Sequence, residues 1–231
     1  MDNLARFTHF LEAIDLKSYR KKFRPIKIVE MDLPREIQAI ALLYQVYWAE
    51  KKFIPFDDFY KRYLQEKKEL LESFRTKIRM CKRCFYLGLP ARIYRTWASL
   101  ITQIHAGYTA ESVFGNGAVS MSEQLDHNGA DIQVNYKDHI LNYQVKKETM
   151  SREVRKEKRS KTQIQGEFID ILYNVPSEDY FTSPKKRNGE FKAPYLRFIK
   201  NQTLKRLNNG FVIFTKHTFI PKKEQIDSGL K

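Results

Sequence analysis

The hydrophobic pattern of the chain changes its period at Gly115. Before this glycine, apolar residues repeat at helical spacing and form one stripe, through Ile93, Trp97, Leu100, Ile101, Ile104 and Tyr108. After it, ADIQVNY and ILNYQVKK alternate apolar and polar residues, with Lys137-Asp138-His139 between them as a turn. The pattern therefore predicts a long helix that opens at Leu89-Pro90 and ends before Gly115, followed by a β-hairpin.

Two more strands and one more helix are expected after this hairpin. Phe168 to Val175 alternates as a third strand ended by Pro176, and FVIFT at 211–215 is a fourth. Between them, Pro194 begins a helix, PYLRFIKNQTLKRL, that Asn209-Gly210 closes. The order of elements predicts an α/β (α+β) fold, with a mixed four-stranded sheet in α-β-β-β-α-β order.

The first part of the chain has only helical patterns. They cover Leu4 to Leu16, Arg35 to Glu50, and Asp57 to about Lys77. A chain of 231 residues fits one domain with an elaborated N-terminal part. We therefore expect a helical N-terminal subdomain over residues 1–88 and a core over residues 89–231.

The charge of the chain indicates a polyanionic partner. Lys and Arg number 42 against 27 Asp and Glu, a formal net charge of +15, which favours nucleic acid first and an anionic membrane second. No segment approaches the roughly 20 apolar residues of a membrane-spanning helix, no leader pattern opens the chain, and no helix has a clean basic amphipathic face. We expect a cytoplasmic protein without a membrane partner.

The two cysteines carry little information about function. Cys81 and Cys84 form a single C-x-x-C without a second pair, which excludes a disulfide framework and supplies only half of a zinc site. His105 falls inside the helical pattern. The cysteines are therefore interpreted as two small, semi-buried thiols.

The hairpin carries the residues that metal-dependent phosphodiester hydrolysis needs. This chemistry requires oxygen ligands for a hard divalent cation, an activated water, and a cation beside the phosphate. Asp131 opens one strand, and Gln144 and Lys146 lie two residues apart on the other, so their side chains share a face. The carbonyl of Val145 is a further candidate ligand. Glu111 follows the buried stripe of the long helix and is a candidate for the second negative charge.

Two neighbours leave alternatives open. Asp126 lies five residues before Asp131, in what should be a glycine-containing loop, and either reaches the metal or is an ordinary turn aspartate. Lys147 points to the face opposite Lys146 unless the strand bulges there, and is otherwise a candidate for a phosphate contact.

Several basic residues are candidates for DNA contact. Arg92 and Arg95 lie among aromatic residues in CKRCFYLGLPARIYRTW, which suits backbone contact or, alternatively, a helix with a charged outer face. The charged connector SREVRKEKRSK contributes Arg152, Arg155 and Lys158, and Lys186 and Arg187 precede the late helix. Spacing does not single out one base-reading residue.

The Asp, Gln-x-Lys hairpin within this order of elements resembles the PD-(D/E)xK nuclease superfamily, whose core is restriction-endonuclease-like. Longer segments are similar to the TaqI-type restriction endonucleases: YRKKFRPIKIVEMDLPRE (19–36), CKRCFYLGLPARIYRTWASLITQIHAGYTAE (81–111), GADIQV, YQVKKE (143–148), PYLRFI and NGFVIFT. The resemblance implies cleavage of double-stranded DNA at TCGA with Mg²⁺ by a homodimer, and a methyltransferase that protects the same site without direct contact expected.

The same resemblance implies catalytic positions at Asp126, Asp131, Gln144, Lys146 and Lys147. Gln144 departs from the acidic residue of the wider superfamily, which makes a role for Glu111 more plausible. A palindromic site read by two copies of one chain also needs a two-fold axis in the protein. Two rival hypotheses are a structure-selective repair or junction nuclease on the same core, and a catalytically silent DNA-binding protein.

Overall fold

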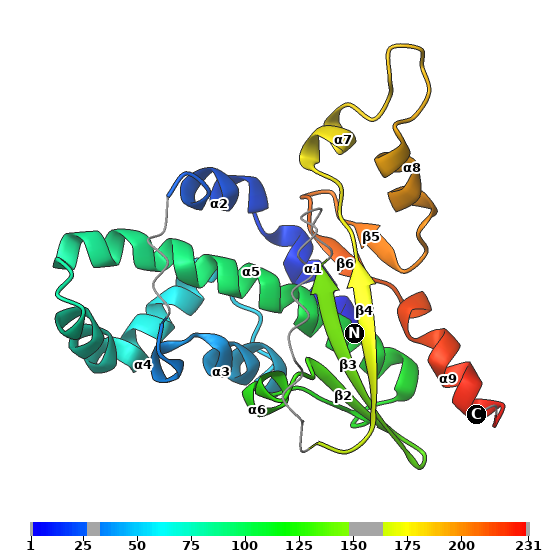
Figure 1. Cartoon of the computed structure of the whole chain (residues 1–231), viewed down its shortest axis with the longest axis horizontal. Helices are drawn as coiled ribbons and strands as arrows, with labels where there is room; N and C mark the ends of the chain where they lie inside the picture. The colour runs from blue at the N-terminus through cyan, green and yellow to red at the C-terminus, as the bar shows by residue number, and fades with distance from the viewer. Residues whose placement is uncertain (1, 27–32, 148–163, 230–231) are drawn as a thin grey trace. The chain divides into compact units, whose positions relative to one another are not determined.

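Figure 1 shows a computed structural model that describes residues 2–26, 33–147 and 164–229. The chain divides into two units, Met1–Ile104 with Asn208–Phe211 and His105–Leu207 with Val212–Lys231. The boundary falls inside one helix, α5 (Lys82–Phe114), which contributes residues to both. The division after residue 88 that the sequence predicts concerns which segments fold independently. It stays a prediction.

The described part of the first unit is helical, as the sequence predicts. Its elements are α1 (Asn3–Ala13), α2 (Leu16–Phe23), the 3₁₀ turn η1 (Arg35–Ile37), α3 (Ile40–Leu43), the π-helical turn η2 (Tyr44–Ala49), α4 (Phe56–Lys77) and the beginning of α5. The helix expected to run to Leu16 ends earlier. The Asp15 carboxylate accepts a hydrogen bond from the Ser18 N–H (2.9 Å) and begins a new helix, α2, there.

Aromatic side chains form the core of the first unit. Trp97 is fully buried, and its Nε1–H donates to the Tyr47 hydroxyl (2.8 Å), which donates to the Ile54 carbonyl (2.6 Å). Phe85 and Tyr94 are also buried. The aromatic residues of the basic 81–97 segment therefore serve packing.

The long helix begins seven residues before its expected opening at Leu89. α5 opens at Lys82, and Pro90 lies inside it rather than in its first turn. An internal proline removes one backbone hydrogen bond and costs about 3 kcal/mol, which the full burial of Phe85 and Leu89 offsets. Cys81 and Cys84 are exposed, not semi-buried, and the Cys84 N–H donates to the Cys81 sulfur (3.1 Å) at the helix start.

The second unit contains the mixed four-stranded sheet that the sequence predicts. Its strands are β1 (Val119–Ser120), β2 (Ile132–Tyr136), β3 (His139–Lys147) and β4 (Glu167–Tyr173), side by side in that order. β1, β2 and β3 are antiparallel, whereas β4 runs parallel to β3 and lies at the edge (Figure 1). The predicted hairpin is confirmed: Tyr136 pairs with His139, and Lys137 adopts φ +52° in the turn.

The last predicted helix and strand are partly wrong. α8 (Ala193–Lys200) stops at Asn201, whose side-chain oxygen accepts hydrogen bonds from the Thr203 N–H (2.9 Å) and hydroxyl (2.6 Å) and so replaces the next helical turn. β5 (Leu204–Arg206) follows and pairs with β6 (Val212–Phe214) in a separate two-stranded sheet. The fourth strand of the main sheet is therefore β1 and not FVIFT.

One face of the main sheet is packed and the other carries polar groups. Tyr143 of β3 contacts Phe219 edge-on at a centroid distance of 5.2 Å, and Tyr173 of β4 contacts Phe214 at 5.3 Å. The remaining elements of this unit are α6 (Glu123–His127), α7 (Glu178–Thr182), η3 (Lys216–Thr218) and α9 (Ile220–Asp227). None of the helices described in the chain has the length and apolarity that crossing a bilayer requires.

Candidate active site

Strand β3 presents Gln144 and Lys146 on the face opposite its packed side chains. Tyr143 and Val145 are buried, at 1% and 8% exposure, whereas Gln144 and Lys146 are partly exposed. Pairing with β4 is unbroken from Leu141 to Lys147, so β3 does not bulge in the parallel ladder. Lys147 consequently points away from Lys146, and the two lysines cannot act on the same atom.

The Asp131 side chain takes the place of a strand partner for β3. Asp131 lies just before β2, its N–H donates to the Tyr143 carbonyl (2.9 Å), and its carboxylate accepts from the Val145 N–H (2.6 Å). The N–H and carbonyl of one strand residue point in the same direction, so the Val145 carbonyl faces the same side as Asp131. The side chain is 6% exposed.

Asp126 joins Asp131 in a pair of carboxyl groups. It lies on the short helix α6, which Ser122 caps, and not in the loop that the sequence predicts. The two carboxyl groups are within hydrogen-bonding reach. Burial raises the pKa of both carboxyl groups, and raises that of Asp131 to about 8. The hydrogen bond from the Val145 N–H lowers the pKa of Asp131, whereas the charge of Asp126 raises it further. Such a pair ionises fully only beside a cation.

One acidic residue near the motif was missed in the sequence. Asp170 of β4 pairs with Gln144 across the parallel ladder, so the two side chains share a face. The Lys146 ammonium lies 3.3 Å from the Asp170 carboxylate, and both side chains are partly exposed. In the sequence, Asp170 is a single aspartate within the apolar strand FIDILY, which could have indicated a role. Which residue it faces depends on the register between β3 and β4, and the sequence does not give that register.

Glu111 is not brought into this group. It lies in the last turn of α5 beside the buried Tyr108 and Ala110 and is itself half-buried. Over the described ranges, its side chain makes no hydrogen bond or ion pair. The same ranges hold no group of three His, Cys, Asp or Glu that is ready for a metal. A role for Glu111 as a ligand stays a prediction.

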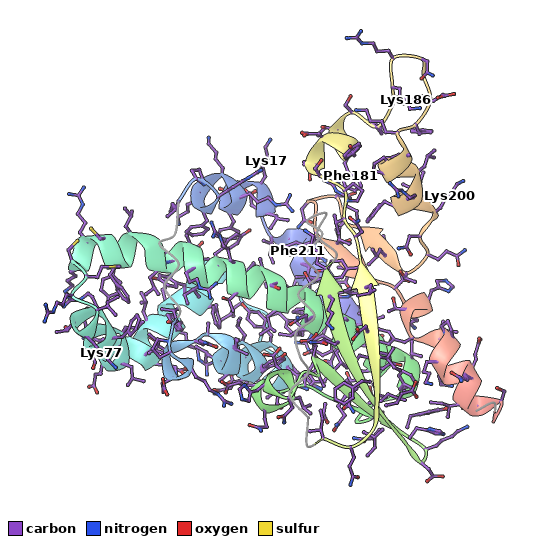
Figure 2. The ribbon with its side chains drawn as sticks, in the orientation of Figure 1. Lys17, Lys77, Phe181, Lys186, Lys200 and Phe211 are labelled. Carbon is purple, nitrogen blue, oxygen red and sulfur yellow. The ribbon has the colours of Figure 1, made fainter. Side chains whose placement is uncertain are left out.

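The candidate DNA-contacting residues lie in separate places. In the first unit, Arg92 is half-buried, and Arg95 is exposed with its guanidinium donating to the Ile26 carbonyl (3.4 Å). In the second, Lys186 and Arg187 are exposed in the loop between α7 and α8 (Figure 2), and the Lys186 ammonium lies 3.1 Å from the Glu190 carboxylate. Arg152, Arg155 and Lys158 lie outside the described residues.

The comparisons with known proteins agree on one family. The family model of the TaqI restriction endonuclease matches residues 4–225. The type II restriction enzyme TaqI of Thermus aquaticus is 33% identical over 243 residues, covering 98% of this chain and 91% of that protein. The type II restriction enzyme TthHB8I of Thermus thermophilus is 33% identical over 219 residues, covering 91% and 83%. No solved structure matches the chain significantly. The chain therefore belongs to the TaqI restriction endonuclease family and is a type II site-specific deoxyribonuclease.

Proposed function

We propose that this restriction endonuclease cleaves both strands of DNA at TCGA, with Mg²⁺ held at Asp131. The observation that carries the proposal is the buried Asp131 carboxylate beside β3, which accepts from the Val145 N–H (2.6 Å) and has Asp126 as its neighbouring carboxyl group. The sequence TCGA rests on the similarity to the TaqI-type enzymes. Type II restriction enzymes generally use a divalent metal; the choice of Mg²⁺ rests on the oxygen chemistry of this group.

The donor set fits a hard divalent cation. Carboxylate and carbonyl oxygens are the ligands that Mg²⁺ takes in proteins, and the group offers Asp131, Asp126 and the Val145 carbonyl. The bound ion would supply Lewis acidity at the phosphate and lower the pKa of a water. The residues fit the ion for a second reason: a cation offsets the burial and, secondarily, the repulsion from Asp126 that raise the pKa of the Asp131 carboxyl group.

Lys146 has the position of the catalytic cation. It shares a face with Gln144, and its charge already acts on the Asp131 carboxyl group. Its ammonium would orient the attacking water or balance charge on the phosphate. Asp170 holds that ammonium in place through the 3.3 Å ion pair, and the Gln144 amide would orient a water. Lys147 acts separately, because it points to the other face.

We infer three properties from the substrate. A palindromic site favours a homodimer, because two copies related by a two-fold axis present one active site to each strand. A methyltransferase that modifies the same sequence would protect the host DNA, without direct contact with this enzyme. The enzyme would act in the cytoplasm, where its DNA substrate is found.

The function is tested by digesting plasmid DNA and mapping the cut ends. With Mg²⁺, we expect discrete fragments that all end at TCGA. Cutting only of branched DNA would support a repair or junction nuclease and would contradict the proposal.

The site is tested with the variants Asp131→Ala and Lys146→Ala. Each should lose cleavage by about a hundredfold or more while keeping most of its DNA affinity, which phosphate contacts supply. Asp138→Ala, in the exposed turn of the same hairpin, is the matched control and should cut normally. Full activity of either site variant would refute the assignment. Glu111→Ala measures whether that residue contributes to metal use or only to folding.

A further inference from the structure

A pocket lies at the carboxyl ends of the two parallel strands of the second unit. Its volume is about 690 Å³, and Lys147 at the end of β3 and Asn174 just after β4 line it. The arrowheads of β3 and β4 point toward α7 and α8 (Figure 1), which contribute Tyr180 and Arg197. Ligands of α/β sheets bind at this end of parallel strands, but none of the roles assigned above uses the pocket.

The lining has the chemistry of a nucleotide site. Over the described residues, Lys147 and Arg197 make no ion pair with a carboxylate, whereas the neighbouring Lys146 is paired with Asp170. Two cations beside a cavity suit a phosphate. The Tyr180 ring and apolar side chains form a wall that suits a sugar and a base.

The pocket adjoins the proposed catalytic face. Leu172, which lines the pocket and is 58% exposed, pairs across the ladder with Lys146. Lys147 directly follows Lys146 but points to the opposite face. The two lysines therefore suit two different phosphates of one strand.

We propose that this pocket binds a nucleotide of the DNA strand next to the scissile phosphate, with the phosphate of that nucleotide held by Lys147 and Arg197. This inference rests on the proposed function, because it takes the strand to pass over Lys146. It gives Lys147 a binding role distinct from the role of Lys146 in the reaction.

The first test compares Arg197→Gln with Lys200→Gln. Both residues are exposed on α8, but only Arg197 lines the pocket, and Lys200 lies at the end of the helix (Figure 2). Affinity for a TCGA duplex is measured in EDTA over a range of salt concentrations, so that cleavage does not enter. One lost phosphate contact lowers the salt slope by about 0.9, which corresponds to about eightfold weaker binding at 0.1 M salt.

Arg197→Gln should show this loss, and Lys200→Gln and Arg197→Lys should not. Equal losses in Arg197→Gln and Lys200→Gln would indicate a general electrostatic effect and would overturn the proposal, as would no loss in Arg197→Gln. Equal melting temperatures of the variants show that folding does not cause the difference.

The second test locates the contact on the DNA. Duplexes are made with one phosphate at a time replaced by an uncharged methylphosphonate. In the wild type, one position beside the scissile phosphate should weaken binding, and in Arg197→Gln that position should have no further effect. Equal sensitivity in both proteins would overturn the proposal.

A third arm separates DNA from free nucleotides as the occupant. If deoxynucleoside monophosphate stabilises the wild type but Arg197→Gln binds DNA normally, the pocket is a site for free nucleotides and the proposal fails. Failure of the proposed function looks different, because the wild type would then not cut at TCGA while the metal-free binding measurements still report on the pocket.

Discussion

Replacing Asp131 by asparagine should make the metal-free protein more stable at neutral and alkaline pH. The asparagine oxygen can still accept from the Val145 N–H, which the carboxylate now does at 2.6 Å. The new NH₂ group can donate to Asp126, the neighbouring carboxyl group. The variant therefore keeps both contacts and removes the charge that burial and Asp126 disfavour.

The size of the effect follows from the raised pKa of Asp131. Burial raises it from 3.8 to about 8, so between these pH values the folded state holds a proton that the unfolded state has lost. The free energy of unfolding of the wild type therefore falls as pH rises through this window. At 1.36 kcal/mol per pH unit, the loss between pH 5 and pH 8 is about 4 kcal/mol at most, because Asp126 shares the proton.

Thermal unfolding in EDTA at pH 5 and pH 8 measures this loss. The wild type should lose melting temperature between the two values, by up to about 10 °C, and Asp131→Asn should lose much less. Asp138→Asn, in the exposed turn of the same hairpin, should follow the wild type. Added Mg²⁺ should stabilise the wild type at pH 8 but not Asp131→Asn. The same pH dependence in wild type and Asp131→Asn would refute the reasoning.

Two further predictions concern the scaffold around this group. Burial lowers the pKa of His105 to about 3, so its contribution to the free energy of unfolding is present above pH 6.5 and is lost as pH falls. In the Asp131→Asn background, which removes the opposing titration of Asp131, urea unfolding should show a loss of about 2 kcal/mol between pH 6.5 and pH 5. Adding His105→Gln should abolish this loss, and an unchanged loss would contradict the reasoning. Gly166 has φ +116°, and an added Cβ would lie 2.4 Å from the Ile140 carbonyl oxygen. Gly166→Ala should therefore cost more than about 2 kcal/mol of unfolding free energy, whereas Gly117→Ala, at φ +80° with open space around it, should cost about 1 kcal/mol; equal costs would remove the steric explanation.

Local patterns predicted the elements that local interactions define. The period of two gave the β2–β3 hairpin and its turn, and Gly115, at φ +109°, ends α5 where expected. Pro90 was misleading. Proline favours the first turn of a helix, but here tertiary packing extends the helix to residues that precede the proline. Asn201 was missed as a helix stop. Its side chain ends the helix by accepting a hydrogen bond from the Thr203 N–H, and an asparagine within a helical pattern does not by itself reveal that choice.

The sequence by itself determined the family, the class of fold and the hairpin that carries Asp131, Gln144 and Lys146. These depend on residue identity and on spacings within about fifteen residues, which a strand or helix of fixed period turns into directions. Only the tertiary structure decided which strand pairs with β3. That pairing brought Asp170 to Lys146, while packing of α6 brought Asp126 to Asp131. Contacts of this kind depend on register and burial, neither of which spacing along the chain specifies.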